Sequence, residues 1–284
     1  MKVGLVLEGG SMRGLYTAGV LDIMMDHNIE IDTIVGTSAG ALFGPNYFSK
    51  QRGRTIRYNK RFCKDYRYIS LLSFLLTGNV VNKKFAYNKV PLKLDKFDNE
   101  TFMKSGKEFY CTATNIKTGE AEYFEIKDTY KQIEELRASS AVPIMTRPVE
   151  INGELYLDGG ISDSIPINKC LELGCDKIIV ILTQPESYEK KPLSSKKVKF
   201  INMEFKKYPN LINRMMNRHN EYNKTLKYLK ELERQDKVLI IRPSEKLDIK
   251  LIERNSDKLE SIYQIGINDA NKKIKKIKKY LNQK

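Results

Sequence analysis

The sequence predicts an α/β fold in which a mostly parallel central sheet is flanked by helices on both faces, with a helical C-terminal extension. Short apolar runs typical of buried strands alternate with stretches of helical periodicity, as in βαβ units. Glycine turns join the first strands to the helices that follow, in "LEGGSMRG" and "VGTSAG". The chain has 284 residues, of which 41% are apolar, so it is long enough to bury a substantial core.

The N-terminal elements show this alternation most clearly. "KVGLVLEGG" is predicted to be a short buried strand, and the helix after it places Leu15, Ala18, Leu21 and Met25 at helical spacing. "IDTIV" is the second predicted strand and "GTSAG" the second tight turn. "ALFGPNYFSKQ" begins another helix, in which Pro45 is tolerated in an early turn.

Four further strands are predicted downstream. "EFYCTATNI" and "AEYFEI" lie on either side of a turn at Thr118 and Gly119. "CDKIIVILTQP" and "KVLIIRP" are typical of buried strands that end at a proline. Because strands and helices alternate, the sheet is expected to be largely parallel and covered on both faces.

An irregular region from residue 52 to 107 contains "YISLLSFLLTGN", which is apolar from Ile69 to Leu76. Two interpretations are open. The segment is either a cap over a functional site or a buried helix of the main core. We favour the buried helix, because apolar runs of this kind are most often buried.

We divide the chain into a core of residues 1–183 and a mostly helical, basic extension of residues 184–284. The extension is expected to pack on the core and to contribute one further strand near 238–241. Its last stretch, "ANKKIKKIKKYLNQK", places Ile274, Ile277 and Leu281 on one side of a helix among lysines. Such a helix can lie on anionic lipid or pack on its own domain, and both alternatives remain open.

The net charge of +15 allows an anionic partner, either nucleic acid or an anionic membrane surface, but it also fits an organism-wide bias toward lysine. No nucleic-acid recognition motif is present, and no basic stripe is interleaved with aromatic residues, so no nucleic-acid partner is expected. The first apolar run, Val3 to Leu7, is too short for a signal-peptide core. We therefore expect a cytoplasmic protein, with peripheral contact at the membrane.

The four cysteines do not form a recognisable site. Cys63, Cys111, Cys170 and Cys175 lack C-x-x-C spacing and lie singly in apolar or mixed segments. The sequence therefore predicts reduced thiols, without a disulfide framework, and no metal or other cofactor.

Ser38 is the first candidate for chemistry. In "GTSAG" it stands between Gly36 and Gly40, directly after a predicted strand and before a predicted helix. A strand that turns sharply into a helix crowds its neighbours, so small residues flank a serine held at the tip. The turn exposes the hydroxyl near free N–H groups at the helix start, as a nucleophile requires.

A nucleophilic serine needs a base, and the two histidines are poor candidates for it. His27 precedes the serine in the chain, and His219 lies in a basic helical stretch, so both are expected at the surface. Asp158 in "LYLDGGISDSIP" follows a strand-like segment, and Gly159 and Gly160 let the chain turn tightly after it. The same pattern is also typical of an ordinary β-turn that begins with aspartate.

The first glycine turn, "EGGSMRG", is suited to bind an oxyanion. Gly9 and Gly10 permit unusual backbone angles, the helix that begins near Ser11 offers free N–H groups, and Arg13 and Gly14 complete the motif. The turn has neither the G-x-G-x-x-G spacing nor the G-K-[ST] ending of nucleotide sites.

Together, "EGGSMRG", "GTSAG" and "DGG" resemble, in this order and spacing, the oxyanion loop, nucleophile elbow and catalytic aspartate of patatin-like phospholipases. "ASSAVPIMTRPVEINGELYLDGG" is similar to the segment that leads into the family's aspartate, so the resemblance covers roughly Lys2 to Thr183. The family has a three-layer sandwich fold and a Ser/Asp dyad without histidine. This agrees with the shortage of suitable histidines in the chain.

The resemblance implies that Ser38 is the nucleophile, that Asp158 is its base, and that Gly9, Gly10 and Ser11 form the oxyanion loop. The family's loop commonly has three successive glycines, whereas this chain has Ser11 in the third position, and serine resists positive φ angles. The part of the chain after residue 183 resembles the helical extension of bacterial members and carries no catalytic motif.

The predicted function is therefore that of a serine acyl hydrolase acting on phospholipids or lysophospholipids. Ser38 attacks the carbonyl carbon of a fatty-acyl ester, Asp158 accepts the hydroxyl proton, and water hydrolyses the acyl-enzyme. The expected partners are a lipid or acyl-ester substrate and an anionic membrane surface, and the oligomeric state is left open. The alternative is a catalytically silent lipid-binding or regulatory protein that retains the fold.

Overall fold

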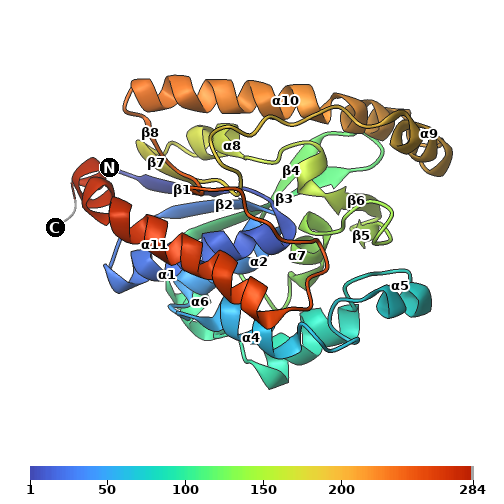
Figure 1. The fold of residues 1–284 in the computed structure, drawn as a ribbon, viewed down its shortest axis with the longest axis horizontal. Helices are drawn as coiled ribbons and strands as arrows, with labels where there is room; N and C mark the ends of the chain where they lie inside the picture. Colours follow the sequence, from blue (N-terminus) through green and yellow to red (C-terminus); the bar gives the residue numbers. More distant parts are fainter. Residues whose placement is uncertain (283–284) are drawn as a thin grey trace.

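Eight strands form one sheet between two layers of helices in the computed structural model, which describes residues 1–282 (Figure 1). The strands are β1 (Val3–Leu7), β2 (Thr33–Thr37), β3 (Glu108–Asn115), β4 (Ala121–Glu125), β5 (Val149–Ile151), β6 (Glu154–Asp158), β7 (Lys177–Ile181) and β8 (Val238–Ile241). The longer helices are α1 (Gly14–Asp26), α4 (Arg54–Phe62), α5 (Leu71–Thr77), α7 (Ile133–Ser139), α9 (Ser195–Glu204), α10 (Pro209–Arg234) and α11 (Ser256–Leu281). The remaining elements are α2 (Ala39–Phe43), α3 (Pro45–Phe48), α6 (Asn99–Lys104), α8 (Ile167–Glu172), the 3₁₀ turns η1 (Ser11–Arg13) and η3 (Gly159–Ile161), and the π-helix η2 (Lys83–Leu94).

The strand order is β5-β6-β3-β2-β1-β7-β8, with β4 also paired to β3. The pairs formed by β1 with β2 and β7, by β2 with β3, and by β7 with β8 are parallel. The pairs made by β4, β5 and β6 are antiparallel. The prediction of a mostly parallel sheet in a three-layer α/β sandwich is confirmed.

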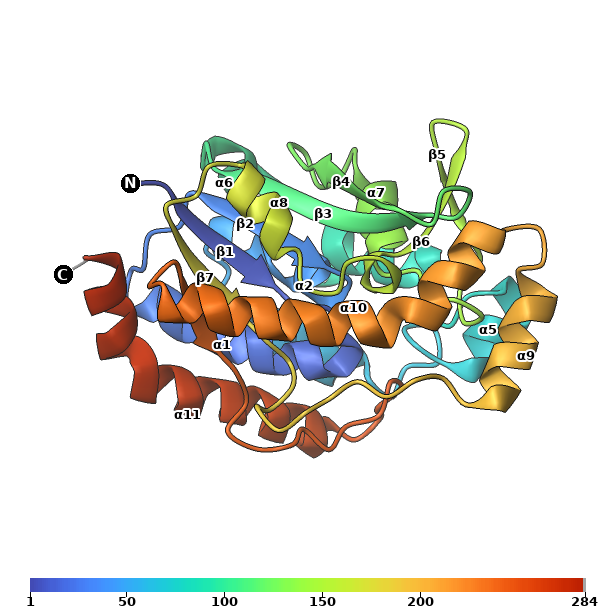
Figure 2. The same cartoon turned by 90° about the horizontal axis from the view of Figure 1, so that it is seen from above.

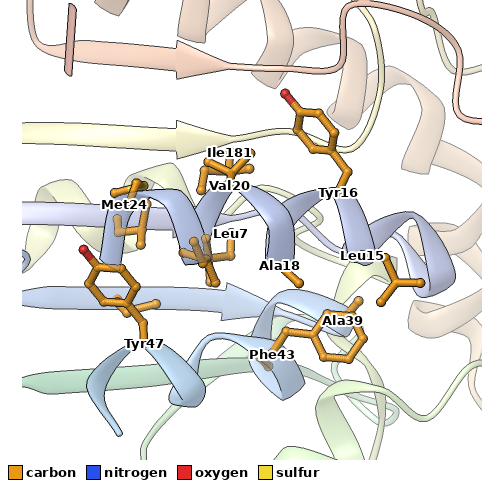
Figure 3. Close-up of a cluster of buried hydrophobic side chains, with 14 of the residues drawn as sticks. Leu7, Leu15, Tyr16, Ala18, Val20, Met24, Ala39, Phe43, Tyr47 and Ile181 are labelled. Carbon is orange, nitrogen blue, oxygen red and sulfur yellow. The ribbon is translucent and has the colours of Figure 1, made fainter. Parts of the chain in front are cut away.

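Alternating side chains of the central strands pack against different helices. Leu5 and Leu7 of β1 belong to the core under α1, α2 and α11, whereas Val6 between them belongs to the core under α8 and α10. Figure 3 shows the first of these cores, where side chains of α1 and α2 pack around Leu7 of β1 and Ile181 of β7. This period of two fixes the sheet between its two helical layers.

The extension packs on the rest of the chain. Strand β8 adds to the sheet beside β7, and α10 and α11 lie on opposite faces of the sheet (Figures 1 and 2). Ile274, Ile277 and Leu281 of α11 are buried in the same core as α1. Of the two alternatives for this basic helix, the structure shows packing on its own chain. No helix within residues 1–282 is long and apolar enough to cross a membrane.

Helix α5 contradicts the favoured interpretation of the apolar segment as a buried core helix. The exposed fractions of Leu71, Leu72, Leu75 and Leu76 lie between 45 and 79%, and the buried residue of α5 is Ser73. The helix forms because the Ser70 and Gly78 positions cap it: the Ser70 hydroxyl accepts the Ser73 N–H, and Gly78 adopts a left-handed conformation. Local capping thus holds a helix whose apolar face points to solvent.

Candidate active site

The carboxyl ends of β2 and β6 meet at one edge of β3. Both strands pair with that edge, because β4 occupies the other edge of β3. Thr37, the last residue of β2, pairs with Thr112, and Asp158, the last residue of β6, pairs with the next position on β3. Because β2 runs parallel and β6 antiparallel to β3, their carboxyl ends face each other. This register brings Ser38 and Asp158 together, although they are 120 residues apart in the chain.

The Ser38 hydroxyl donates a hydrogen bond of 2.7 Å to Oδ2 of Asp158, and both residues are 7% exposed. The other carboxylate oxygen accepts the N–H of Gly160 at 2.7 Å. Burial raises the pKa of Asp158, and the hydrogen bonds from Ser38 and Gly160 oppose part of that rise. Asp158 is therefore a stronger base than an exposed aspartate and is oriented toward the serine hydroxyl.

Ser38 itself has a φ of 54°, in the left-handed region that side chains rarely adopt. The turn is tight enough to exclude side chains on both sides of it. A Cβ on Gly36 would lie 2.7 Å from the carbonyl carbon of Gly40, and one on Gly40 would lie 2.5 Å from the carbonyl oxygen of Leu7. The two glycines that flank Ser38 in the sequence thus permit the sharp turn that presents its hydroxyl.

The glycine turn after β1 lies beside this elbow. Ser11 has a φ of 50° despite its side chain, so it takes the conformation that a third glycine would take. Within residues 1–282 the N–H groups of Gly10 and Ser11 have no acceptor, and both residues line a cavity with Ser38. They are therefore the candidate donors to an oxyanion.

Gly9 and Gly14, two residues of the predicted oxyanion hole, have N–H groups that already donate hydrogen bonds within the chain. The N–H of Gly9 donates to the carbonyl of Ser164 at 3.2 Å, so it is engaged even though the residue lies in the loop. Gly14 begins α1 and its N–H donates to the carbonyl of Ser11. A Cβ on Gly14 would lie 2.7 Å from that of Ala39, so this glycine lets α1 approach α2. Neither amide is free in this structure.

Two cavities meet at Ser38. One, of about 180 Å³, is mainly apolar and extends between α2, η2 and α7, with Leu42, Val90 and Leu136 in its wall. The other, of about 570 Å³, is lined by five cationic side chains: Arg13, Lys190, Lys196, Lys197 and Arg218. Ser11 and Ser38 line both cavities. An ester held at Ser38 would thus have apolar surface on one side and positive charge on the other.

The histidines lie elsewhere, as the sequence predicts. His27 follows the end of α1, and His219 on α10 bonds through Nδ1 to the carbonyl of Met216 at 3.0 Å. In the part of the chain that the structure describes, neither forms a hydrogen bond with Ser38 or Asp158.

Sequence reasoning missed several residues at this site. The hydroxyl of Ser139, at the end of α7, accepts the N–H of Ser38 at 3.0 Å and so fixes the elbow. Lys190 and Arg218 come from the extension, where no motif marks them. Ser139 could have been suspected only from its position in "ASSAVP", which belongs to the segment that is similar to the family's sequence before the catalytic aspartate.

Two family models and several known proteins match parts of the chain. The family model described as "Patatin-like phospholipase" matches residues 5–171, and a "Domain of unknown function (DUF6363)" matches residues 208–282. The protein YjjU of Escherichia coli strain K12, described as uncharacterised, is 33% identical over 190 residues, which cover 65% of this chain and 52% of that protein.

Fungal relatives carry a functional name. Lysophospholipase NTE1 of Scheffersomyces stipitis is 28% identical over 284 residues, covering 95% of this chain and 18% of that protein. The NTE1 lysophospholipase of Saccharomyces cerevisiae is 28% identical over 184 residues, covering 63% of this chain and 10% of that protein. The chain thus spans about half the length of the bacterial relative and about a fifth or less of these fungal ones.

Among solved structures, VipD from Legionella pneumophila matches with a TM-score of 0.47 and 14% identity, covering 95% of this chain and 66% of that one. The family assignment does not depend on this match. The family model itself covers more than half of the 284 residues and contains the glycine turn, the serine elbow and the aspartate. The protein therefore belongs to the patatin-like phospholipase family.

Proposed function

We propose that the protein is a serine acyl hydrolase that cleaves fatty-acyl esters of phospholipids or lysophospholipids. The observation that carries the proposal is the 2.7 Å hydrogen bond from Ser38 to the buried carboxylate of Asp158, at the point where an apolar and a cationic cavity meet. Membership of the patatin-like phospholipase family and the lysophospholipase names of the fungal relatives support a lipid substrate.

In the proposed reaction, the Ser38 oxygen attacks the ester carbonyl carbon while Asp158 takes the hydroxyl proton. The N–H groups of Gly10 and Ser11 stabilise the oxyanion that forms. The bond to the alcohol then breaks, and the alcohol leaves with the proton held by Asp158. Water attacks the acyl-enzyme while Asp158 accepts one of its protons. The bond between the acyl group and Ser38 then breaks, Asp158 passes that proton to the Ser38 oxygen, and the fatty acid is released.

Covalent labelling tests the nucleophile directly. Wild-type protein treated with a fluorescent fluorophosphonate is expected to gain one adduct by intact mass, and the Ser38→Ala variant is expected to gain none. The reaction is run with and without anionic vesicles, so that labelling is also detected if the oxyanion loop takes its active conformation only at a membrane. Absence of labelling in both conditions would contradict the proposal and favour a lipid-binding protein that retains the fold.

We also propose that the protein works at the periphery of an anionic membrane on the cytoplasmic side. The four exposed leucines of α5 lie in the sequence between Ile69 and Val80, which line the apolar cavity, so both ends of α5 are connected to the wall of that cavity. Helices α5 and α9 lie at the same end of the molecule (Figures 1 and 2), and Lys196 and Lys197 of α9 line the second cavity. Apolar side chains beside lysines suit a surface that carries anionic lipid.

Substitution of α5 should weaken membrane binding. Each buried leucine contributes about 1.5–3 kcal/mol, so the double variant Leu75→Glu/Leu76→Glu is expected to lose more than about 100-fold in affinity for vesicles of phosphatidylcholine and phosphatidylglycerol. Met103→Glu, which changes an exposed apolar residue on α6, serves as the control. Binding is measured by co-sedimentation with the vesicles. This surface would be ruled out if the double variant bound as tightly as the native protein, or if binding did not depend on salt and anionic lipid.

A further inference from the structure

Four of the five cations that line the cavity beside Asp158 come from the extension. Lys190 lies in the connection between β7 and α9, and Arg218 lies on α10. The backbone of Lys190 is held on α10 by Asn223, whose side chain accepts the Lys190 N–H at 2.9 Å and donates to its carbonyl at 3.0 Å. Arg218 reaches the turn after the aspartate, with its Nη2 3.4 Å from the hydroxyl of Ser164.

The position of Arg218 is close to the dyad. A Cβ placed on Gly160 would lie 3.2 Å from Arg218 Nη2, and Gly160 is the residue whose N–H binds Asp158. Arg13, on the glycine turn, lines the cavity from the opposite end of the sequence. Cations from η1, from α10 and from the β7–α9 connection therefore line one cavity next to the proposed nucleophile.

These cations lack anionic partners. In the described part of the chain, Arg13, Lys190 and Arg218 form no ion pair, and the buried Nε of Arg13 has no hydrogen-bond acceptor. The carboxylate of Glu8 lies close enough to favour the charge of Lys190, but it already accepts the Tyr222 hydroxyl at 2.7 Å and the Thr183 N–H at 2.5 Å. A buried guanidinium nitrogen without an acceptor is costly, so this cavity is suited to an anionic ligand.

The mutual repulsion of the cations supports the same conclusion. Desolvation and the neighbouring charge of Arg218 lower the pKa of Lys190 to about 8. Its ammonium group lies 4.3 Å from the centre of the Tyr222 ring, which partly stabilises the charge. An anion bound among these side chains would remove the repulsion and satisfy the free guanidinium.

We propose that Arg13, Lys190 and Arg218 form a subsite for the phosphate of an acyl glycerophospholipid with a net negative headgroup. The inference rests on the proposed function, because it places the acyl chain in the apolar cavity and the scissile ester at Ser38. Guanidinium groups bind phosphate through paired N–H donors, and the lysines add charge. Lys196 and Lys197 line the same cavity and would disfavour a cationic headgroup.

The first test compares two substrates that share an oleoyl chain, oleoyl-glycerol 3-phosphate and monooleoylglycerol, in the same neutral detergent micelles. The double variant Lys190→Gln/Arg218→Gln is expected to lose at least about 100-fold in kcat/KM for the phosphate substrate, or about tenfold for each charge removed. The loss is expected to be confined to that substrate. Lys227→Gln is the matched control, because Lys227 is exposed on α10 about two and a half turns after Arg218.

The second test measures binding without turnover. The Ser38→Ala variant is titrated with oleoyl-glycerol 3-phosphate, with monooleoylglycerol and with glycerol 3-phosphate. The subsite predicts that the acylated phosphate binds most tightly and that the Lys190 and Arg218 substitutions remove this preference. If binding depends on these cations but no hydrolysis depends on Ser38, the proposed function fails and the subsite stands.

Two outcomes would overturn the subsite itself. The first is an equal loss of kcat/KM for both substrates in the double variant, which would indicate a structural defect. The second is binding of glycerol 3-phosphate as tight as that of the acylated phosphate, which would indicate a site for soluble phosphate esters instead of a lipid headgroup.

Discussion

Replacement of Asp158 by asparagine is expected to lower kcat/KM for ester hydrolysis by about 10²–10⁴-fold, the usual contribution of a positioned general base. Asparagine keeps the size of the side chain but cannot take up the hydroxyl proton of Ser38, whose oxygen lies 2.7 Å from Oδ2 of Asp158 in the native chain. Ser38→Ala is expected to cost at least as much, because it removes the attacking atom. Initial rates on a lysophospholipid in micelles measure both effects.

Asp163→Asn is the control for this substitution. Asp163 is a half-buried carboxylate in the same segment that accepts the Tyr123 hydroxyl at 2.7 Å, and within the described residues it forms no hydrogen bond with Ser38. Its variant should retain most of the activity, and circular dichroism should show all three variants folded. Near-normal activity of both Ser38→Ala and Asp158→Asn would rule out the dyad.

The pH dependence provides a second measurement on the same base. Asp158 accepts a proton only when it is ionised, and burial raises its pKa above the ordinary value of about 3.9. The activity should therefore fall as the pH drops through this raised pKa, at a higher pH than for an exposed aspartate. An acid limb centred at or below pH 4 would contradict the raised pKa of Asp158.

The largest expected loss of stability comes from breaking the ion pair between Arg54 and Asp95. Arg54 is 5% exposed and lines the apolar cavity, and its Nε lies 3.2 Å from Oδ1 of Asp95. Desolvation lowers the pKa of Arg54, so the guanidinium depends on its partners. Asp95→Ala would leave a buried charge without its counter-ion and is expected to lower the free energy of unfolding by about 3–5 kcal/mol.

Urea unfolding followed by circular dichroism measures this loss. Glu100→Ala is the matched control, because Glu100 also pairs with a cation, Lys104, but both side chains are more than 70% exposed. Exposed pairs contribute about 0–1 kcal/mol, so this variant should unfold near the native midpoint. A loss for Asp95→Ala no larger than that of the control would show that Arg54 is stabilised without Asp95.

Much of the fold could be predicted from local sequence. Strand β1 follows from its short apolar run and helix α1 from the helical spacing of its apolar residues, and Gly36 and Gly40 mark the elbow because a sharp turn excludes side chains. The sequence also proposed Ser38 and Asp158 as a pair, and their side chains do form a hydrogen bond. Their catalytic roles remain a prediction, because a hydrogen bond alone does not establish chemistry.

The features that sequence reasoning missed depend on contacts between distant segments. Apolar runs are usually buried, which favours a core position for α5, but the structure buries Ser73 of this helix and leaves its four leucines exposed. Arg218 is one of many basic residues on α10, and only the packing of that helix decides which of them faces Asp158. The engaged N–H of Gly9 follows from its contact with Ser164, far along the chain.

The strand order also has a consequence for how the protein is made. Strand β1 lies in the middle of the sheet, yet Val3 pairs with Lys177, and β8 and α11 close the core later still. Pairings between such distant residues form slowly, because a long loop must close before they contribute stability. During synthesis, the edge of β1 that pairs with β7 stays unpaired until β7 has left the ribosome. The nascent chain is thus expected to depend on protection from aggregation, and to complete its core only after α11 has been translated.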